Sequence, residues 1–186
     1  MTPIWRPRNG VSATCLAEIA PDRIANVTGD GWLRFRGRQV RAALGRGGLR
    51  ADKQEGDGAT PLGRLPLRQL LYRADRVAIP ATRLPRAPIA AADGWCDDPD
   101  HPDYNRAIRL PHPARNECLW RQDAVYDLIV VLGWNDAPVV GNRGSAIFLH
   151  LARPDYAPTD GCVALALPDL TWLLAQDVAA LEIRAS

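Results

Sequence analysis

The sequence predicts a mostly β fold, a sandwich or open barrel with one or two packed helices and a long irregular loop. Short apolar and β-branched runs alternate with turn sequences, continuous apolar runs lie in the C-terminal half, and helical periodicity is confined to one late segment. With 186 residues, the chain has the length of one domain. We expect an irregular arm over residues 1–23 and the folded domain over residues 24–186.

The first half of the domain reads as a series of short strands. Residues 24–27, 32–35 and 39–44 are β-like and are separated by turn sequences at 28–31 and 36–37. Residues 62–71 form another extended candidate, in which Pro66 marks a strand edge or a break.

The middle of the chain, residues 80–121, is rich in Pro, Asp and Arg. Within it, Pro99 and Pro102 interrupt residues 95–106, and the residue before a proline is pushed to an extended conformation. We therefore expect neither strand nor helix in residues 95–106. A long ordered loop in a compact domain is usually functional.

Regular structure returns in the C-terminal part. The continuous apolar run at 126–132 is typical of a strand buried on both faces, and residues 146–149 and 163–167 are further strand candidates. Pro168 stands where the first residue of a helix would be. Residues 178–183 are expected to close the chain as its last strand.

Composition argues against several classes of function. The net charge of +2 and the scattered arginines give no support for nucleic-acid binding, and no apolar stretch is long enough to span a membrane. The four cysteines form no C-x-x-C pair and the three histidines lack a zinc-ligand spacing, so no metal or cofactor is expected. Cys96 and Cys118 could form a disulfide bridge or remain free thiols, and the sequence leaves both alternatives open.

The candidate catalytic residues lie in the segment from His150 to Cys162. A buried-looking strand ends in His150, a Pro-interrupted loop follows, and Asp160-Gly161-Cys162 opens the next strand. If the two strands are neighbours, the thiol faces the imidazole, which would lower the thiol pKa by stabilising the thiolate. Gly161 lets the backbone approach a substrate carbonyl, and the amides around residues 160–162 are candidates for binding the developing oxyanion.

A strand-borne histidine followed by Thr159-Asp160-Gly161-Cys162 resembles the active-site signature of the YkuD-type L,D-transpeptidase family. The upstream segment KQEGDGATPLG, residues 53–63, resembles the family's K-x-G-D-x-x-T-P-x-G motif, in which Asp57 and Thr60 are expected to fix a turn. The chain departs from the usual pattern at Ala164, where arginine or asparagine is common, at Leu151, where glycine is common, and in its short histidine-to-cysteine loop. These departures favour the compact class that makes 1-3 links over the class that makes 3-3 links.

The resemblance implies a cysteine enzyme acting on peptidoglycan stem peptides as donor and acceptor. Cys162 would attack a stem-peptide carbonyl and form a thioester, His150 would act as base, and the carbonyl of Leu151 would orient the imidazole. The amides of Gly161 and Cys162 would stabilise the oxyanion. Further expected substrate-binding residues are Trp134, Asn135, Arg143, Thr159 and Asp160, together with Tyr104 and Arg106 of the long loop.

Two other functions remain open. The same catalytic pair would serve a cysteine carboxypeptidase or endopeptidase that trims or recycles muropeptides, and a buried, inert Cys162 would fit a non-catalytic peptide-binding module of the envelope. The substrate implies the periplasm or cell envelope, whereas residues 1–10 contain no recognisable secretory signal, which leaves the cytoplasm open. The resemblance also makes carbapenem-type β-lactams candidate inhibitors.

Overall fold

The main sheet of the protein closes on itself. The computed structural model describes residues 19–185; Cys15 and most of the arm expected over residues 1–23 lie outside them. Nine strands form one sheet: β1 (Ile24–Thr28), β2 (Trp32–Phe35), β3 (Arg38–Ala43), β6 (Gly63–Tyr72), β7 (Arg86–Pro88), β11 (Leu128–Leu132), β12 (Phe148–Leu151), β13 (Val163–Leu165) and β14 (Ala180–Arg184).

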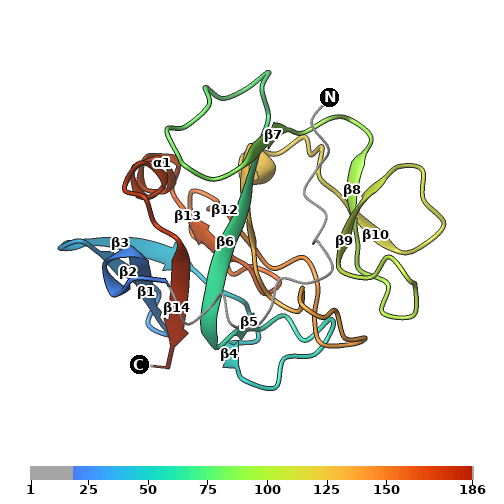
Figure 1. The fold of residues 1–186 in the computed structure, drawn as a ribbon, viewed down its shortest axis with the longest axis horizontal. Helices are drawn as coiled ribbons and strands as arrows, with labels where there is room; N and C mark the ends of the chain where they lie inside the picture. Colours follow the sequence, from blue (N-terminus) through green and yellow to red (C-terminus); the bar gives the residue numbers. More distant parts are fainter. Residues whose placement is uncertain (1–18, 186) are drawn as a thin grey trace.

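The strand order is β11-β12-β13-β3-β2-β1-β14-β6-β7, and β6 also pairs with β11. That additional pairing closes the strands from β11 to β6 into a barrel. Strand β7 is left outside the barrel, beside the end of β6 (Figure 1). Strand β6 can do this because its first residues pair with β14 and its later ones with β11. The mostly β fold expected from the sequence is confirmed.

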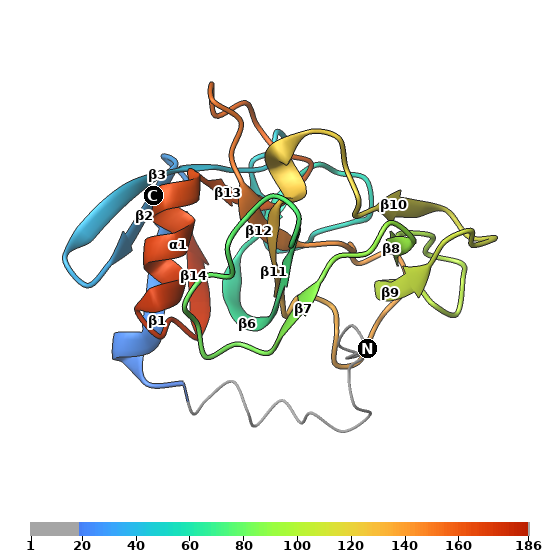
Figure 2. The same ribbon diagram turned by 90° about the horizontal axis from the view of Figure 1, so that it is seen from above.

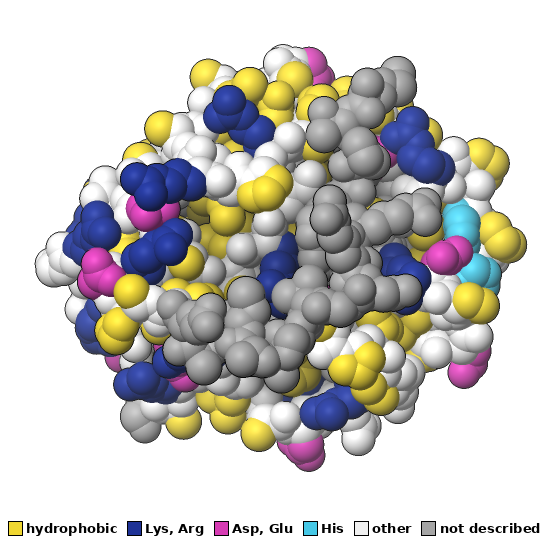
Figure 3. Space-filling model, viewed as in Figure 1, with side chains coloured by type: hydrophobic (Ala, Val, Ile, Leu, Met, Phe, Trp, Pro, Cys, Tyr) yellow, Lys and Arg dark blue, Asp and Glu magenta, His cyan; other side chains and the backbone are white. Residues whose placement is uncertain are grey.

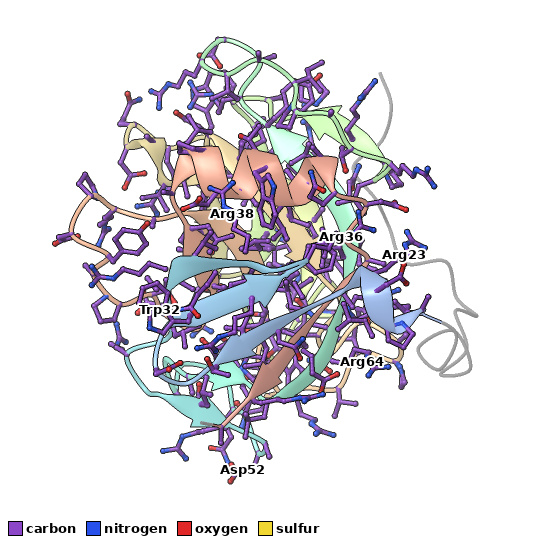
Figure 4. All side chains as sticks on the ribbon, turned by 90° about the vertical axis from the view of Figure 1, so that its left-hand side faces the viewer. Arg23, Trp32, Arg36, Arg38, Asp52 and Arg64 are labelled. Atoms are coloured by element: carbon purple, nitrogen blue, oxygen red, sulfur yellow. The ribbon has the colours of Figure 1, made fainter. Side chains whose placement is uncertain are left out.

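The barrel interior and its single described α-helix share one hydrophobic core. Helix α1 (Leu167–Ala175) has Pro168 in its first turn and buries Leu170, Leu173 and Leu174 in this core. On the outside, Arg38 of β3, labelled in Figure 4, forms an ion pair with Asp169 at 2.6 Å. Its guanidinium lies over the ring of Trp172. The helix is therefore anchored to the sheet on both its buried and its exposed sides.

Strand β11 is buried on both faces, as its continuous apolar run predicts. Leu128, Val130 and Leu132 belong to the interior core, whereas Ile129 and Val131 belong to a second core on the outer face. The expected strand start at residue 126 is corrected by the structure, because Tyr126 ends the 3-10 turn η3 (Ala124–Tyr126). A second such turn, η2 (Pro21–Arg23), precedes β1.

A small second sheet covers the outer core. It consists of β8 (Asp93–Cys96), β9 (Arg106–Arg109) and β10 (Asn116–Cys118) in the order β10-β8-β9, and lies at the opposite end of the molecule from α1 (Figures 1 and 2). The expectation of no strand within residues 95–106 was wrong at both ends. Pro99 and Pro102 constrain only the connection between β8 and β9.

Two further details complete the described fold. Strands β4 (Leu49–Arg50) and β5 (Thr60–Pro61) form a short parallel pair. Cys96 is buried opposite Asn116 and Cys118 is exposed opposite Gly94, and both thiols are free. Within residues 19–185, no helix has both the length and the apolar character needed to cross a bilayer.

Candidate active site

His150 and Cys162 come from neighbouring parallel strands. Strand β12 pairs with β13 so that Leu149 faces Val163 and His150 faces Ala164. Because side chains alternate along a strand, Cys162, one residue before β13, points to the same face as His150. Both residues line a cavity of about 550 Å³. The thiol and the imidazole thus share one face of the sheet and one cavity.

Two threonine hydroxyls hold the backbone of the cysteine. Thr159 Oγ1 donates to the carbonyl oxygen of Cys162 at 2.7 Å, and Thr60 Oγ1 donates to the same oxygen at 3.2 Å. Thr60 is fully buried and its oxygen also accepts a hydrogen bond from Gly45 N–H at 2.8 Å. The upstream motif therefore braces the cysteine directly, across about a hundred residues of sequence.

Glycine is required at position 161, where the chain passes close to the backbone of Ala59. Its φ is +129°, and a Cβ at this position would lie 2.8 Å from the carbonyl oxygen of Ala59. An L-amino acid with a side chain would be strained both by its backbone angle and by contact with neighbouring backbone. Gly161 N–H donates to Thr159 Oγ1 at 3.2 Å, so this amide already has a partner.

The turn at residues 53–59 is organised around Asp57. Its carboxylate accepts hydrogen bonds from the ammonium of buried Lys53 at 2.6 Å and from the backbone N–H groups of Gln54 and Ala59. Burial works to raise the pKa of Asp57, but these hydrogen bonds outweigh it and hold the pKa below its usual value. Asp57 fixes the turn that presents Thr60, as its place in the motif suggests.

The Cys162 thiol is a neutral group at rest. Phe148 N–H donates to Sγ, and the thiol donates to the carbonyl oxygen of Ala146, both at 3.3 Å. Burial raises the pKa of Cys162 to about 12, and the negative charge of Glu117 contributes to the increase. The expectation that the histidine lowers the thiol pKa is not met in this state, because desolvation dominates.

His150 is also neutral at rest. Burial lowers the pKa of His150 to about 4, although the bond to Leu151 acts in the opposite direction. Its Nδ1 lies 3.0 Å from the carbonyl oxygen of Leu151, which can only accept, so Nδ1 carries the hydrogen and Nε2 is left as a base. The ring of Tyr126 packs edge-to-face on the imidazole, with the ring centroids 5.4 Å apart.

The structure brings two of the expected substrate-binding residues into the cavity. Thr159 and Asp160 line it, and Asp160 forms an ion pair with Arg46, which lines it as well. Both flank the cysteine in sequence, and both reach the cavity because the loop that precedes β13 folds back over residues 44–46.

The other expected substrate-binding residues lie outside the lining of this cavity. Trp134 Nε1 donates to the carbonyl oxygen of Arg143 at 2.7 Å, and Asn135 bridges Val140 and Gly144, so both side chains close their own loop. Tyr104 is buried and donates to Glu55. Arg106 is exposed on β9.

Several cavity residues were missed by the sequence interpretation. Glu117, Arg121 and Tyr126 line the cavity, and they come from β10 and the segment that follows it. Asn105 does not line the cavity, but in its left-handed conformation at φ +53° it ties the β8–β9 connection to the chain before β12 through Ala146 N–H. The isolated Glu117 carried no motif, and only its place in the small sheet brings it to the cavity.

Basic side chains are numerous around this cavity. Those in its lining are Arg46, Lys53, Arg115, Arg121 and Arg153. On the molecular face shown in Figure 3, by contrast, Lys and Arg side chains are dispersed among hydrophobic and acidic ones. The lining also contains the acidic Glu55, Asp97, Glu117 and Asp160, and two of its arginines are already paired within it, Arg46 with Asp160 and Arg115 with Asp97, so the cavity is mixed in charge.

One group of residues among those described has the composition of a metal site, although none was expected. His101, Asp103 and His112 present ligand atoms within 4.8 Å of one another. The Nδ1 atom of each histidine accepts a backbone hydrogen bond, from Asp103 N–H and from Ala114 N–H. These residues are not part of the lining of the cavity that holds Cys162.

Comparison with known proteins identifies a family for this chain. The family model for the YkuD L,D-transpeptidase catalytic domain matches residues 16–178. Among solved structures, the chain is similar to L,D-transpeptidase 1 of Mycobacterium tuberculosis, with 13% identity and a TM-score of 0.38. That match covers 88% of this chain but 61% of the other. No curated protein matches.

Proposed function

This chain belongs to the YkuD family of L,D-transpeptidase catalytic domains, and on that premise we propose that it is a cysteine L,D-transpeptidase. Its substrates would be peptidoglycan stem peptides, and its catalytic domain would extend over residues 24–186. The observation that carries the proposal is the common face of Cys162 and His150 on two adjacent strands, at one cavity. Its place of action would be the cell envelope.

In the first half-reaction, Cys162 attacks a carbonyl of the donor stem. Because both groups are neutral at rest, the thiol proton passes to His150 Nε2 as the S–C bond forms. The imidazole then gives this proton to the departing amine, and a thioester remains on Cys162. The hydrogen bond between Nδ1 and Leu151 supports this role, since it fixes the tautomer whose Nε2 can accept a proton.

The amide of Cys162 is the proposed donor to the oxyanion. Gly161 N–H is engaged by Thr159, and the two threonine hydroxyls fix the peptide plane that follows Cys162. Phe148 N–H, which contacts Sγ, would stabilise the thiolate when it forms and later when it leaves.

In the second half-reaction, the side-chain amine of another stem attacks the thioester carbon and the C–S bond breaks. The arginines in the lining are the proposed contacts for the carboxylates of stem peptides, and Thr159 and Asp160 are the proposed contacts beside the nucleophile. We favour 1-3 links, since the short loop after His150 leaves the cavity open. Water in place of the amine would make the enzyme a hydrolase.

Purified tetrapeptide muropeptides test these proposals. The wild-type protein should form dimers and a covalent adduct on Cys162, both seen by mass spectrometry, and Cys162→Ala should form neither. A D-Ala leaving group would assign 3-3 links instead of 1-3 links. Product derived only from water, even with an amine acceptor present, would assign the hydrolase. A wild-type protein that forms neither dimers nor an adduct would favour the binding module.

A further inference from the structure

Glu117 brings an acidic group to the cavity from outside both sequence motifs. It lies on β10, lines the same cavity as Cys162, and about 30% of its side chain is exposed. Its Oε1 accepts a hydrogen bond of 2.6 Å from Tyr126 Oη, and the Tyr126 ring packs on His150. The carboxylate is therefore connected to the base through one aromatic side chain.

The other carboxylates in the cavity lining are engaged in ion pairs or hydrogen bonds within the protein. Asp97 is paired with Arg115 at 3.1 Å, and Asp160 is paired with Arg46. Glu55 accepts two hydroxyl hydrogen bonds that hold the surrounding loops together.

Glu117, by comparison, is poorly compensated. The cation that pairs with it is Arg121, at 3.9 Å, and the guanidinium of Arg121 is already bonded twice to Asp123, at 2.7 and 2.8 Å. The carboxylate of Glu117 can therefore bind a cation that enters the cavity from outside.

The charge of Glu117 does not help the first half-reaction. A negative group near the thiol raises the thiol pKa, and Glu117 is the nearby charge that contributes most to this effect on Cys162. It would also repel a developing oxyanion. A role for Glu117 in the reaction therefore belongs to a step in which a positively charged group enters the cavity.

The acceptor amine is such a group. Resting on the proposed function, we propose that Glu117 is a specificity-determining residue that binds the ammonium group of the acceptor beside the thioester. The ammonium donates to Glu117 and releases one proton to solvent, and the free amine attacks the thioester carbon. As the C–S bond breaks, the second N–H proton passes through His150 to the Cys162 sulfur.

Water needs no such contact, so Glu117 sets the balance between cross-linking and hydrolysis. The position fits this role because an attacking amine must lie near both the sulfur and the imidazole. Glu117 lines the cavity that contains both groups, and its hydrogen-bond partner Tyr126 packs on the imidazole.

Glu117→Gln tests the inference, because its amide oxygen can still accept from Tyr126 while the charge is lost. With donor and a primary-amine acceptor, we expect KM for the acceptor to rise about tenfold or more. Hydrolysis of the acyl-enzyme should be unchanged, and acylation should be equal or faster because the thiol pKa falls. Tyr126→Phe keeps the carboxylate and the ring on His150 but removes the hydrogen bond to Glu117, so it should change the preference for amine over water less than Glu117→Gln does.

Equal losses in hydrolysis and aminolysis, or an unchanged KM for the acceptor, would overturn the role of Glu117. Glu117→Asp retains the charge and should keep a KM closer to that of the wild type, which covers the case in which the glutamine variant folds poorly. Failure of the proposed function has a separate signature: a wild-type protein that forms no acyl-enzyme overturns both proposals.

Discussion

Thr60 Oγ1 donates a hydrogen bond of 3.2 Å to the carbonyl oxygen of Cys162, joining positions 102 residues apart in the chain. Thr60 also accepts from Gly45 N–H, so one buried hydroxyl connects three segments below the cavity. The position of the nucleophile thus depends on the upstream motif as much as on its own strand.

Replacing Thr60 should loosen this support. Thr60→Val keeps the shape of the side chain but leaves the buried Gly45 N–H without its acceptor, at a cost of about 1–3 kcal/mol in the free energy of unfolding. Urea denaturation would measure the loss, and the rate of acylation should fall with it. Thr60→Ser keeps the hydroxyl and should restore most of both; equal behaviour of the two variants would contradict the argument.

Gly161 should tolerate no side chain. Gly161→Ala combines a left-handed backbone angle with a Cβ placed 2.8 Å from Ala59 O, and we expect loss of acylation together with a lower melting temperature. The matched control is Gly37→Ala, at φ +77° with open space around it, which should cost only about 1–2 kcal/mol. If Gly161→Ala cost no more than Gly37→Ala, the close approach to Ala59 would be disproved.

The thiol should react slowly in the free enzyme. With its pKa raised to about 12 by burial, Cys162 should be alkylated by iodoacetamide at least about tenfold more slowly than an ordinary thiol at pH 8. The rate should rise about tenfold per pH unit between pH 8 and 10, as the thiolate fraction rises. Peptide mapping provides an internal control, since exposed Cys118 reports ordinary reactivity. Faster labelling of Cys162 than of Cys118 at pH 7 would contradict a neutral resting thiol.

His150 should make the fold sensitive to acid. The pKa of His150 is about 4 in the folded protein and about 6.5 in the unfolded protein. Between these two pH values the imidazole binds a proton in the unfolded state but stays neutral in the folded state. Stability from this source is complete above pH 6.5 and is lost as the pH falls toward 4, by about 2 kcal/mol at pH 5. Denaturation curves for wild type and His150→Gln at pH 7.5 and pH 5 isolate the effect. Identical pH dependence in the two proteins would refute it.

Asn105 should matter to the cavity without lining it. Its side-chain oxygen accepts from Trp95 Nε1 and Ala146 N–H, and its amide donates to the carbonyl oxygens of Trp134 and Asn135. Asn105→Asp keeps the acceptor but loses the donors, so we expect about 1–3 kcal/mol of destabilisation and slower acylation. Thermal unfolding and single-turnover mass spectrometry would measure both, and wild-type values in both would exclude this linking role.

The local signals in the sequence were sufficient for most elements of the barrel. Alternation and turn residues located β1, β2 and β3, and the apolar run of β11 indicated burial on both faces, because these patterns depend on neighbouring residues. The strands β8 and β9 were missed because the prolines between them dominated the interpretation. A hairpin with a long connection is defined by pairing between its strands, which the composition of that connection does not reveal.

The sequence by itself determined the chemistry that is available: a histidine at a strand end, a cysteine after a glycine, and a threonine motif far upstream. Only the tertiary structure decided that the thiol and imidazole share a face, that both are neutral at rest, and that Glu117 joins them at the cavity. The physical reason is that residue identity fixes which protons and charges exist. Protonation and proximity depend instead on burial and strand register, and these arise only when distant segments pack together.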